Sequence, residues 1–500
     1  MKSTSKAAEK ALEKGREAYN TGDFKSAIIN FTKAIKLDPK NMESYNNRAI
    51  TYCELEKYTE AIADYTKVIE MDPKDAATYS NRGNAYSSIE KYSEAIADYT
   101  KVIEMDPKDA AAYSNRGNAY SSIEKYPEAI ADFTKAIKLD PKNTKSYINR
   151  AITYCELEKH TEAIADFTKA IKLDPKNTES YNNRAITYCE LEKYTEAIAD
   201  YTKALQLDPT YVHAYYGRGN VYSSLQKYTE AIADYTKVIE MGPLVDAYYN
   251  RGNAYSSLQK YTEAIADYTK VIELDLEYVA AYNNRGNMYC NLKKYSEAIA
   301  DYTKVIELDP KDAAAYSNRG NAYSDLKKYP EAIADYTKVI EMDPEYAASY
   351  NNRGYGYKAL GKTKEAIADY TKVIEMDPEN AAAYNKRGNA YGELEMHTEA
   401  IADFTKAIKL NPEYRTAYFN RGNGYKALEK TKEAETDYTK VIEMDPEYAA
   451  AYNKRGYAYI GQQKFREAIA DFAKAIKLDP MYVNMTPPAY CLAIKVGQND

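Results

Sequence analysis

The residues best suited to catalysis or metal binding are few in this chain and lie far apart. The histidines are His160, His213 and His397, and the first and last of these replace a recurring tyrosine in distant segments, too far apart to share a metal. No glycine-rich phosphate loop, nucleophile elbow or HExxH motif is present. Acidic residues recur identically along the chain, so no carboxylate pair stands out as general acid and base. The sequence therefore predicts a protein that is not an enzyme and has no metal or cofactor.

The five cysteines are predicted to be reduced thiols. They are Cys53, Cys155, Cys189, Cys290 and Cys491, and no CxxC pair occurs among them. Four of them occupy one recurring place, and equivalent residues of stacked repeats lie too far apart for a disulfide. This pattern is typical of a cytoplasmic or nuclear protein whose cysteines are small surface-lining side chains rather than redox groups.

Asparagine recurs at two places, where its amide is suited to binding a peptide backbone. The amide offers a donor and an acceptor side by side, which matches the C=O and N–H of one residue of an extended chain. These side chains are expected to face water, and the alternative is that asparagine is only a polar filler, although it is a poor helix former. The candidate peptide-binding residues are Asn47, Asn81, Asn84, Asn115, Asn118, Asn149, Asn183, Asn220, Asn250, Asn253, Asn284, Asn287, Asn318, Asn321, Asn352, Asn389, Asn420 and Asn423.

A period of 34 residues organises the chain. Arg48, Arg82 and Arg116 open a series of arginines in which every step is 34 except one step of 33 near residue 250. With a first copy that has Lys14 at this place, fourteen repeats fill residues 8–482. A fixed period of this length indicates a repeat array rather than the several globular domains usual for 500 residues.

Each repeat is predicted to be a pair of helices. In residues 76–109, Tyr79, Gly83 and Tyr86 share one face of a first helix, and the glycine allows close approach of a neighbour. A second apolar series predicts a second helix, which Ser93 is expected to cap and an Asp–Pro pair ends. Within the second helix, small alanine recurs beside a large aromatic residue, a combination that lets two helices interlock.

These features resemble the tetratricopeptide repeat. The resemblance covers residues 8–482 and rests on aromatic–Gly–Tyr in the first helix, Tyr–Ala–aromatic in the second and Asp–Pro at the end. It implies an all-α fold, a right-handed α-solenoid of stacked helix–turn–helix repeats whose first helices line a concave groove. The asparagine series is similar to the groove of the repeat region of O-GlcNAc transferase, whose catalytic part has no counterpart here.

An ion pair is predicted inside each repeat, between Arg82 and Asp98 and their copies. The arginine place and the aspartate place are each filled in thirteen repeats, and the repeat that lacks one lacks both. The rival acid is the aspartate before proline in the preceding repeat. It is lost at Gly242 and Asn411 while the following arginine is kept, which favours the pair within the repeat.

The ends and one joint depart from the regular pattern. Residues 1–7 are expected to fray, and residues 483–500 to form a short capping helix and tail, with a disordered tail as the alternative. One residue is lost near 242–250. The loss is either a tolerated loop deletion or a bend between residues 8–244 and 245–482.

Composition excludes several classes of partner. The net charge of −7 argues against nucleic acid, because phosphate binding needs a basic face. The 55 tyrosines fall mostly at core spacing, so they do not indicate base stacking. No apolar run approaches the ~20 residues of a membrane span, and the first residues include no apolar secretory segment.

The predicted function is a non-enzymatic scaffold or adaptor that holds extended peptide segments of other proteins in an asparagine-lined groove. Three alternatives stay open: a co-chaperone adaptor, a helper or regulatory subunit of a separate enzyme, and a structural spacer. The co-chaperone resemblance implies a lysine–asparagine–asparagine–lysine–arginine clamp for a terminal carboxylate. Ser80 and Ala77 occupy the lysine places of one repeat, and Lys145 fits a lysine place elsewhere with Asn149 where arginine belongs.

Overall fold

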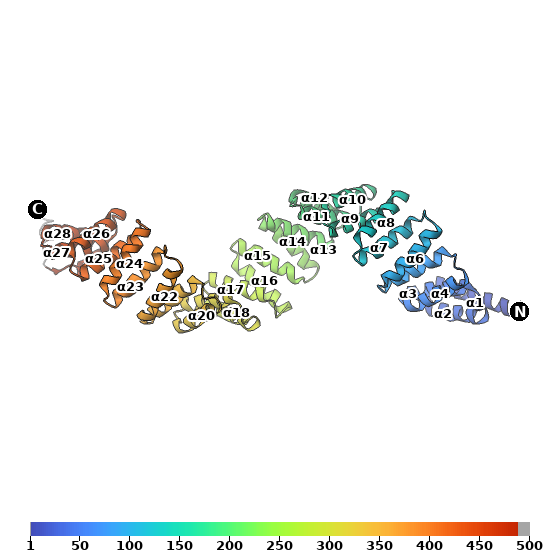
Figure 1. The fold of residues 1–500 in the computed structure, drawn as a ribbon, viewed down its shortest axis with the longest axis horizontal. Helices are drawn as coiled ribbons and strands as arrows, with labels where there is room; N and C mark the ends of the chain where they lie inside the picture. Colours follow the sequence, from blue (N-terminus) through green and yellow to red (C-terminus); the bar gives the residue numbers. More distant parts are fainter. Residues whose placement is uncertain (1, 489–500) are drawn as a thin grey trace. The chain divides into compact units, whose positions relative to one another are not determined.

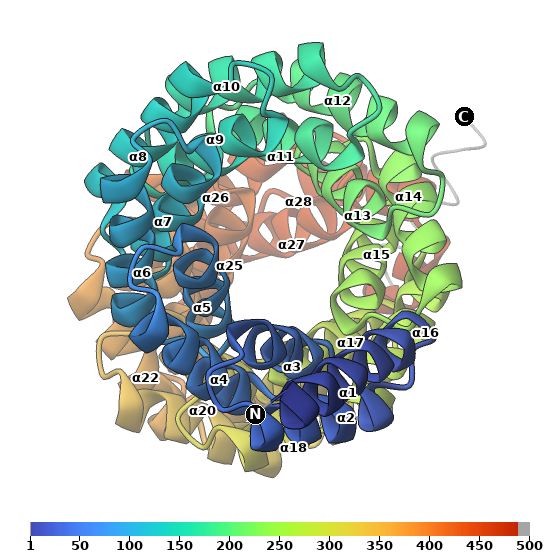
Figure 2. The same ribbon diagram turned by 90° about the vertical axis from the view of Figure 1, so that its right-hand side faces the viewer.

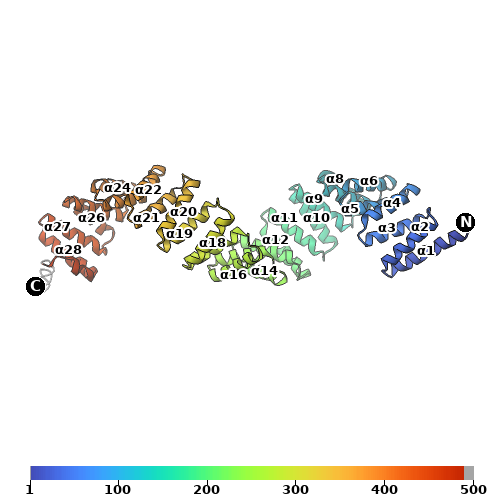
Figure 3. The ribbon, with the colours of Figure 1, turned by 90° about the horizontal axis from the view of Figure 1, so that it is seen from below.

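The protein is all-α in the computed structural model, which describes residues 2–488 (Figure 1). Within that range, no β-strand is present and the chain forms consecutive helix pairs. The chain divides into two compact units, Met1–Ala254 and Tyr255–Asp500. In each unit the pairs stack side by side as an α-solenoid, which confirms the predicted fold class (Figure 3).

Odd-numbered helices are the first helices of the repeats and even-numbered helices are the second. The first helices are α1 (Lys2–Asn20), α3 (Met42–Glu54), α5 (Ala76–Ser88), α7 (Ala110–Ser122), α9 (Thr144–Glu156), α11 (Thr178–Glu190), α13 (Val212–Ser224), α15 (Val245–Ser257), α17 (Val279–Asn291), α19 (Ala313–Asp325), α21 (Ala347–Ala359), α23 (Ala381–Glu393), α25 (Arg415–Ala427) and α27 (Ala449–Gly461). The second helices are α2 (Phe24–Leu37), α4 (Tyr58–Met71), α6 (Tyr92–Met105), α8 (Tyr126–Leu139), α10 (His160–Leu173), α12 (Tyr194–Leu207), α14 (Tyr228–Met241), α16 (Tyr261–Leu274), α18 (Tyr295–Leu308), α20 (Tyr329–Met342), α22 (Thr363–Met376), α24 (His397–Leu410), α26 (Thr431–Met444) and α28 (Phe465–Leu478).

Capping side chains set the start of some helices but not of others. Asp75 caps α5, because its carboxylate accepts from the Thr78 N–H at 3.2 Å and from the Thr78 hydroxyl at 2.7 Å. The expected Ser93 cap is wrong. Helix α6 begins at Tyr92, two residues earlier than a Ser93 cap would place it, and its N-cap residue, Lys91, makes no side-chain cap hydrogen bond. Apolar packing of that tyrosine, rather than a capping side chain, sets the start of the second helix.

Small and large side chains interlock inside each repeat as predicted. Ala95 is fully buried and Tyr99 is 2% exposed. A Cβ added to Gly83 would lie 2.8 Å from the Tyr99 ring, so glycine is required there for the first helix to approach the second. The same contact recurs between Gly117 and Phe133.

The predicted ion pair within the repeat is confirmed. Arg82 donates from Nε and Nη2 to the two oxygens of Asp98, each at 2.8 Å. Its third nitrogen, Nη1, donates at 3.0 Å to the hydroxyl of Thr66 in the preceding repeat. Equivalent bidentate pairs lie at Arg48, Arg116, Arg150, Arg184, Arg218, Arg285, Arg319, Arg353, Arg387, Arg421 and Arg455. The guanidinium therefore joins two helices of one repeat and also joins neighbouring repeats.

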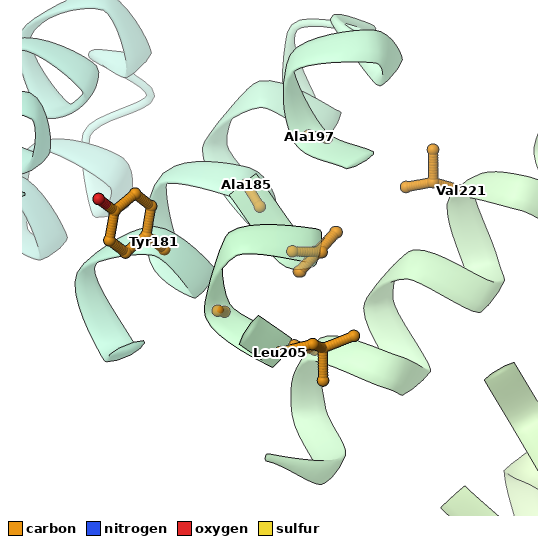
Figure 4. Close-up of a cluster of buried hydrophobic side chains, with 8 residues drawn as sticks. Tyr181, Ala185, Ala197, Leu205 and Val221 are labelled. Carbon is orange, nitrogen blue, oxygen red and sulfur yellow. The ribbon is translucent and has the colours of Figure 1, made fainter. Parts of the chain in front are cut away.

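Within each unit, the hydrophobic core runs from one repeat into the next and has no single centre. Figure 4 shows one stretch of it, in which Tyr181 and Ala185 of α11, Ala197 and Leu205 of α12, and Val221 of α13 form one buried cluster. The second helix of a repeat thus packs on its own first helix and on the first helix of the next repeat. Stability in such an array depends on neighbours rather than on distant segments.

The first helices lie on the inner side of each unit's curve. In unit 1, Figure 2 shows α3, α9, α11 and α13 inside and α4, α10 and α12 outside. In unit 2, α17 and α25 lie inside α18 and α22 (Figure 2). Consecutive first helices also touch one another, as α5 touches α7 and α7 touches α9. We call the surface formed by the first helices the inner face.

The residue lost near 242–250 shortens the loop between two helices. Helix α14 ends at Met241 and α15 begins at Val245, and Gly242 between them is extended, with φ −180° and ψ 146°. At a regular joint, the Asp72 carboxylate accepts from the Lys74 N–H at 3.0 Å, a bond that glycine has no side chain to make. The bend between residues 8–244 and 245–482 stays a prediction, which small-angle scattering tests.

Two further predictions concern the ends of the chain. Helix α1 begins at Lys2, so residues 2–7 are helical, and their fraying in solution stays a prediction for hydrogen exchange. A short 3₁₀ helix, Pro480–Met485, follows α28. The capping helix predicted after Pro488 lies outside the described residues.

Candidate functional site

All the predicted peptide-binding asparagines lie on first helices, and most are less exposed than expected. Asn84 and Asn321 are exposed, whereas the others are half-buried. The expectation that these side chains simply face water is therefore wrong for most of them. The reason is that consecutive first helices are close enough for their polar side chains to bond to one another.

Hydrogen bonds between asparagines link consecutive first helices. Asn115 Nδ2 donates to Asn84 Oδ1 at 3.3 Å, and Asn149 Nδ2 donates to Asn118 Oδ1 at 2.7 Å. The equivalent bonds are Asn250 to Asn220 at 3.3 Å and Asn352 to Asn321 at 3.2 Å. Asn420 instead donates at 3.2 Å to Asn385, which was not among the predicted residues. Within residues 2–488, no such bond is made by Asn47, Asn81, Asn318 or Asn389.

Buried tyrosines use the oxygen of the same asparagines. Tyr99 OH donates to Asn84 Oδ1 at 2.8 Å, so this oxygen accepts from Tyr99 and from Asn115 together. The same tyrosine-to-asparagine bond is made from Tyr235 to Asn220, Tyr302 to Asn287, Tyr336 to Asn321 and Tyr438 to Asn423. The predicted pairing of one donor and one acceptor for each amide is therefore wrong at Asn84, Asn220 and Asn321, whose oxygens each accept two hydrogen bonds. The Nδ2 hydrogens of these three asparagines remain to donate.

Three cavities occur at equivalent places on the inner face. Each is lined by residues of two consecutive first helices and by the aromatic side chain of the second helix. The first, of about 320 Å³, is lined by Asn389, Asn420, Asn423 and Phe404. The other two are lined by Asn47 and Phe31 (about 320 Å³) and by Asn321, Asn352 and Tyr336 (about 290 Å³). Six predicted asparagines thus border a hollow of the size of an amino-acid side chain.

Within residues 2–488, the four cysteines and three histidines are not grouped with one another. Cys53 lies 3.9 Å from the Tyr65 hydroxyl and Cys290 lies 3.6 Å from the Tyr302 hydroxyl. Burial raises the pKa of both thiols, which disfavours the nucleophilic thiolate. Across residues 2–488, no three His, Cys, Asp or Glu side chains are grouped to hold a metal ion. The described helices include none that is long and apolar enough to cross a membrane.

Four lysines on the inner face were missed by the sequence analysis. They are Lys358, Lys386, Lys426 and Lys454, on α21, α23, α25 and α27, and all four are half-buried. The sequence does show them, as departures from the asparagine, serine and cysteine found at these places in earlier repeats. A search for recurring residues passes over them, because each replaces the common residue in only two repeats.

Comparison with protein families agrees with this architecture. A tetratricopeptide repeat model matches nine segments that together exceed half of the chain: residues 76–109, 110–143, 144–177, 212–243, 245–278, 313–346, 381–414, 416–448 and 449–482. The chain belongs to the tetratricopeptide repeat family. Related models match most of the remaining repeats, including residues 8–41 and 51–89. Membership of this family supports a protein-interaction scaffold.

Similarity to individual proteins is limited to a few repeats. The chain is 45% identical over 53 residues to Hsp70-Hsp90 organizing protein 3 of Arabidopsis thaliana and 47% identical over 53 residues to stress-induced-phosphoprotein 1 of Caenorhabditis elegans. These matches span 11% of this chain and 10% and 16% of the two relatives. Among solved structures, YrrB, a TPR protein with an unusual peptide-binding site, is 29% identical, with 37% of this chain and 95% of YrrB covered and a TM-score of 0.35.

Proposed function

We propose that this protein is a non-enzymatic scaffold whose inner face holds extended peptide segments of other proteins. The observation that supports it most is the set of three equivalent cavities between consecutive first helices, each bordered by predicted asparagines. A cavity of this size accepts a side chain of a bound segment, and the amides beside it bond the backbone. Four cysteines are free thiols, which fits the proposed cytoplasmic or nuclear location.

The hydrogen bonds of the asparagines define which backbone group they bind. At Asn84 and Asn321 the amide oxygen already accepts from a tyrosine hydroxyl and from an asparagine of the next repeat. Their Nδ2 groups are left as donors, and Asn115 and Asn352 each keep a second Nδ2 hydrogen. Such donors are matched by the carbonyl oxygens of an extended peptide. Each such bond contributes about 1 kcal/mol net, so useful affinity requires several repeats at once.

The test removes donors without disturbing the core. Asn115, Asn149, Asn250 and Asn352 are changed together to alanine. The fold is expected to survive because Tyr99, Tyr235 and Tyr336 still donate to Asn84, Asn220 and Asn321, and only Asn118 loses its asparagine partner without a tyrosine in reserve. Peptides selected from a random library against the full chain serve as probes, and their affinity is expected to fall at least about tenfold. Circular dichroism checks that the helices remain.

A matched control changes four exposed polar residues of second helices. These are Ser93, Thr161, Thr195 and Thr229, each replaced by alanine. Their replacement is expected to leave the affinity of the selected peptides unchanged. Equal affinity in the asparagine variant and the control would show that the peptides bind elsewhere, and would overturn the proposal.

A co-chaperone adaptor is the second candidate. It is favoured by the similarity to Hsp70-Hsp90 organizing protein 3 over 53 residues. A clamp for a terminal carboxylate would distinguish it, because amidation of an acidic peptide's C-terminus removes the charge that the clamp binds. Binding that is lost on amidation would favour this candidate over the general scaffold.

A further inference from the structure

The inner face of the last four repeats differs in charge from the rest. Helices α21, α23, α25 and α27 carry Lys358, Lys386, Lys426 and Lys454, whereas among first helices α3 to α19 the one lysine is Lys145. The chain as a whole has a net charge of −7. The four lysines therefore form a local basic surface on an acidic protein, and we call them the lysine cluster.

Three members of the lysine cluster lack an acidic partner. Lys386 Nζ donates to Asn351 Oδ1 at 2.7 Å, and Lys426 Nζ lies 4.4 Å above the centre of the Tyr457 ring. In the described part of the chain, no carboxylate lies within ion-pair distance of Lys386, Lys426 or Lys454. Burial lowers the pKa of the Lys386 and Lys426 ammonium groups, and the nearby charge of Lys454 lowers that of Lys426 further. Lys426 and Lys454 lie close enough to affect each other's charge, and half-buried cations so placed favour an added anion.

Unlike the other three members of the lysine cluster, Lys358 has an acidic partner. It forms an ion pair with Glu393 of the next repeat at 3.1 Å. Lys426 occupies the place of Lys358 two repeats later, but the residue at the place of Glu393 is Gly461. A carboxylate is thus supplied by the chain at one of the two sites and is missing at the other.

A cavity lies within the same surface. Its lining includes Lys358, Asn389, Asn423 and Phe404. Phe404 has no hydroxyl, and a Cβ added to Gly392 would meet no atom within 4 Å, so the space that larger residues fill in other repeats is empty. The cavity offers an aromatic wall for an apolar side chain, with amide donors beside it.

We infer that the inner face from α21 to α27 docks an acidic peptide segment, with carboxylates on Lys386, Lys426 and Lys454 and an apolar side chain in the cavity beside Phe404. This inference rests on the proposed function and adds the chemical class of the bound segment. Glutamate or aspartate on the segment takes the place that Glu393 takes at Lys358. The test peptide has capped ends, so that only its side-chain carboxylates are available to the lysines.

The experiment measures binding of a capped peptide of mixed glutamate, leucine and serine to the full chain, beside a counterpart with glutamine for glutamate. The glutamate peptide is expected to bind more tightly, and added salt is expected to weaken it. The variant K426Q/K454Q is expected to lower its affinity about tenfold and to leave the glutamine peptide unaffected. K426R/K454R keeps both charges and is expected to retain binding.

A control variant and a second ligand class complete the test. K440Q/K474Q makes the same change of charge on exposed lysines of the second helices α26 and α28, and is expected to have no effect. Equal affinity for both peptides, with no response to K426Q/K454Q, would overturn the acidic-segment inference and leave the scaffold function intact. If neither peptide binds, the result counts against both the acidic-segment inference and the scaffold function. Tighter binding of a single-stranded oligonucleotide at the same lysines would also overturn the inference.

Discussion

Removal of Arg116 should destabilise its repeat far more than the loss of one surface charge would. Arg116 donates to both oxygens of Asp132, at 2.7 and 2.9 Å, and to the Thr100 hydroxyl of the preceding repeat at 2.9 Å. The side chains are 17% and 9% exposed. Replacement of Arg116 by alanine leaves the Asp132 carboxylate buried without its cation, and this costs about 3–5 kcal/mol in comparable sites.

The remaining contacts of Arg116 add to this cost. Its guanidinium lies 5.7 Å from the centre of the Tyr113 ring and 5.8 Å from that of Tyr120. Asp132→Ala is less costly, because Arg116 keeps these rings and the Thr100 hydroxyl. In the double variant no unpaired charge is left, so its destabilisation should fall below the sum of the single effects by about 1–3 kcal/mol.

Hydrogen exchange with mass spectrometry is the suitable assay, because an array of repeats does not unfold in one step. The free energy of local opening is read from α7 and α8, with α25 and α26 as an internal reference in the same molecule. We expect opening to be much easier in the Arg116→Ala protein, and the double variant to recover part of the loss. Fully additive effects of the two substitutions would refute the pairing argument.

Two further outcomes follow from the buried tyrosines. Tyr235 is 1% exposed, so Tyr235→Ala should lower the free energy of unfolding of its repeat by about 3–5 kcal/mol. Hydrogen exchange should become faster in α13 and α14 while distant repeats stay protected. A uniform loss of protection along the chain would contradict an array in which each repeat is stabilised only by its neighbours. Burial raises the pKa of Tyr65, Tyr201 and Tyr302. Because the unfolded chain then loses phenolic protons first, stability should fall as pH rises above about 10, by about 1.4 kcal/mol per such tyrosine at about pH 11. Tyrosinate absorbance should reach its full value only together with helix loss, and complete ionisation of the tyrosines with intact helices would contradict this.

The fold could be predicted from the sequence because each place is repeated many times under the same constraint. The pairing of Arg82 with Asp98 followed from the one repeat that lacks both residues, and the structure confirms it. The close approach at Gly83 followed from helical spacing, and the Tyr99 ring fills the space. Where packing or ion pairing requires the same residue type at one place of every repeat, the periodicity of the sequence alone reveals that requirement.

The site was harder to predict, because it depends on side-chain conformation between helices. Spacing places Asn84 on the inner face, but it does not show that Tyr99 and Asn115 both donate to its oxygen. The Ser93 cap was wrong for a related reason: packing of Tyr92 places the helix start two residues earlier. The lysine cluster was visible in the sequence, yet it breaks the pattern on which the prediction relied.

A core substitution therefore changes what the inner face offers to a ligand. Where the aromatic residue is tyrosine, as at Tyr99, its hydroxyl occupies the oxygen of the facing asparagine and leaves a donor. Where it is phenylalanine, as at Phe404, no hydroxyl reaches Asn389, whose amide keeps its donor and its acceptor beside a cavity. In the proposed groove, a bound segment meets donor sites at Asn84, Asn220 and Asn321 and a site for a whole peptide group at Asn389. Repeats that are nearly identical in fold are thereby made chemically distinct, through one atom of a buried ring.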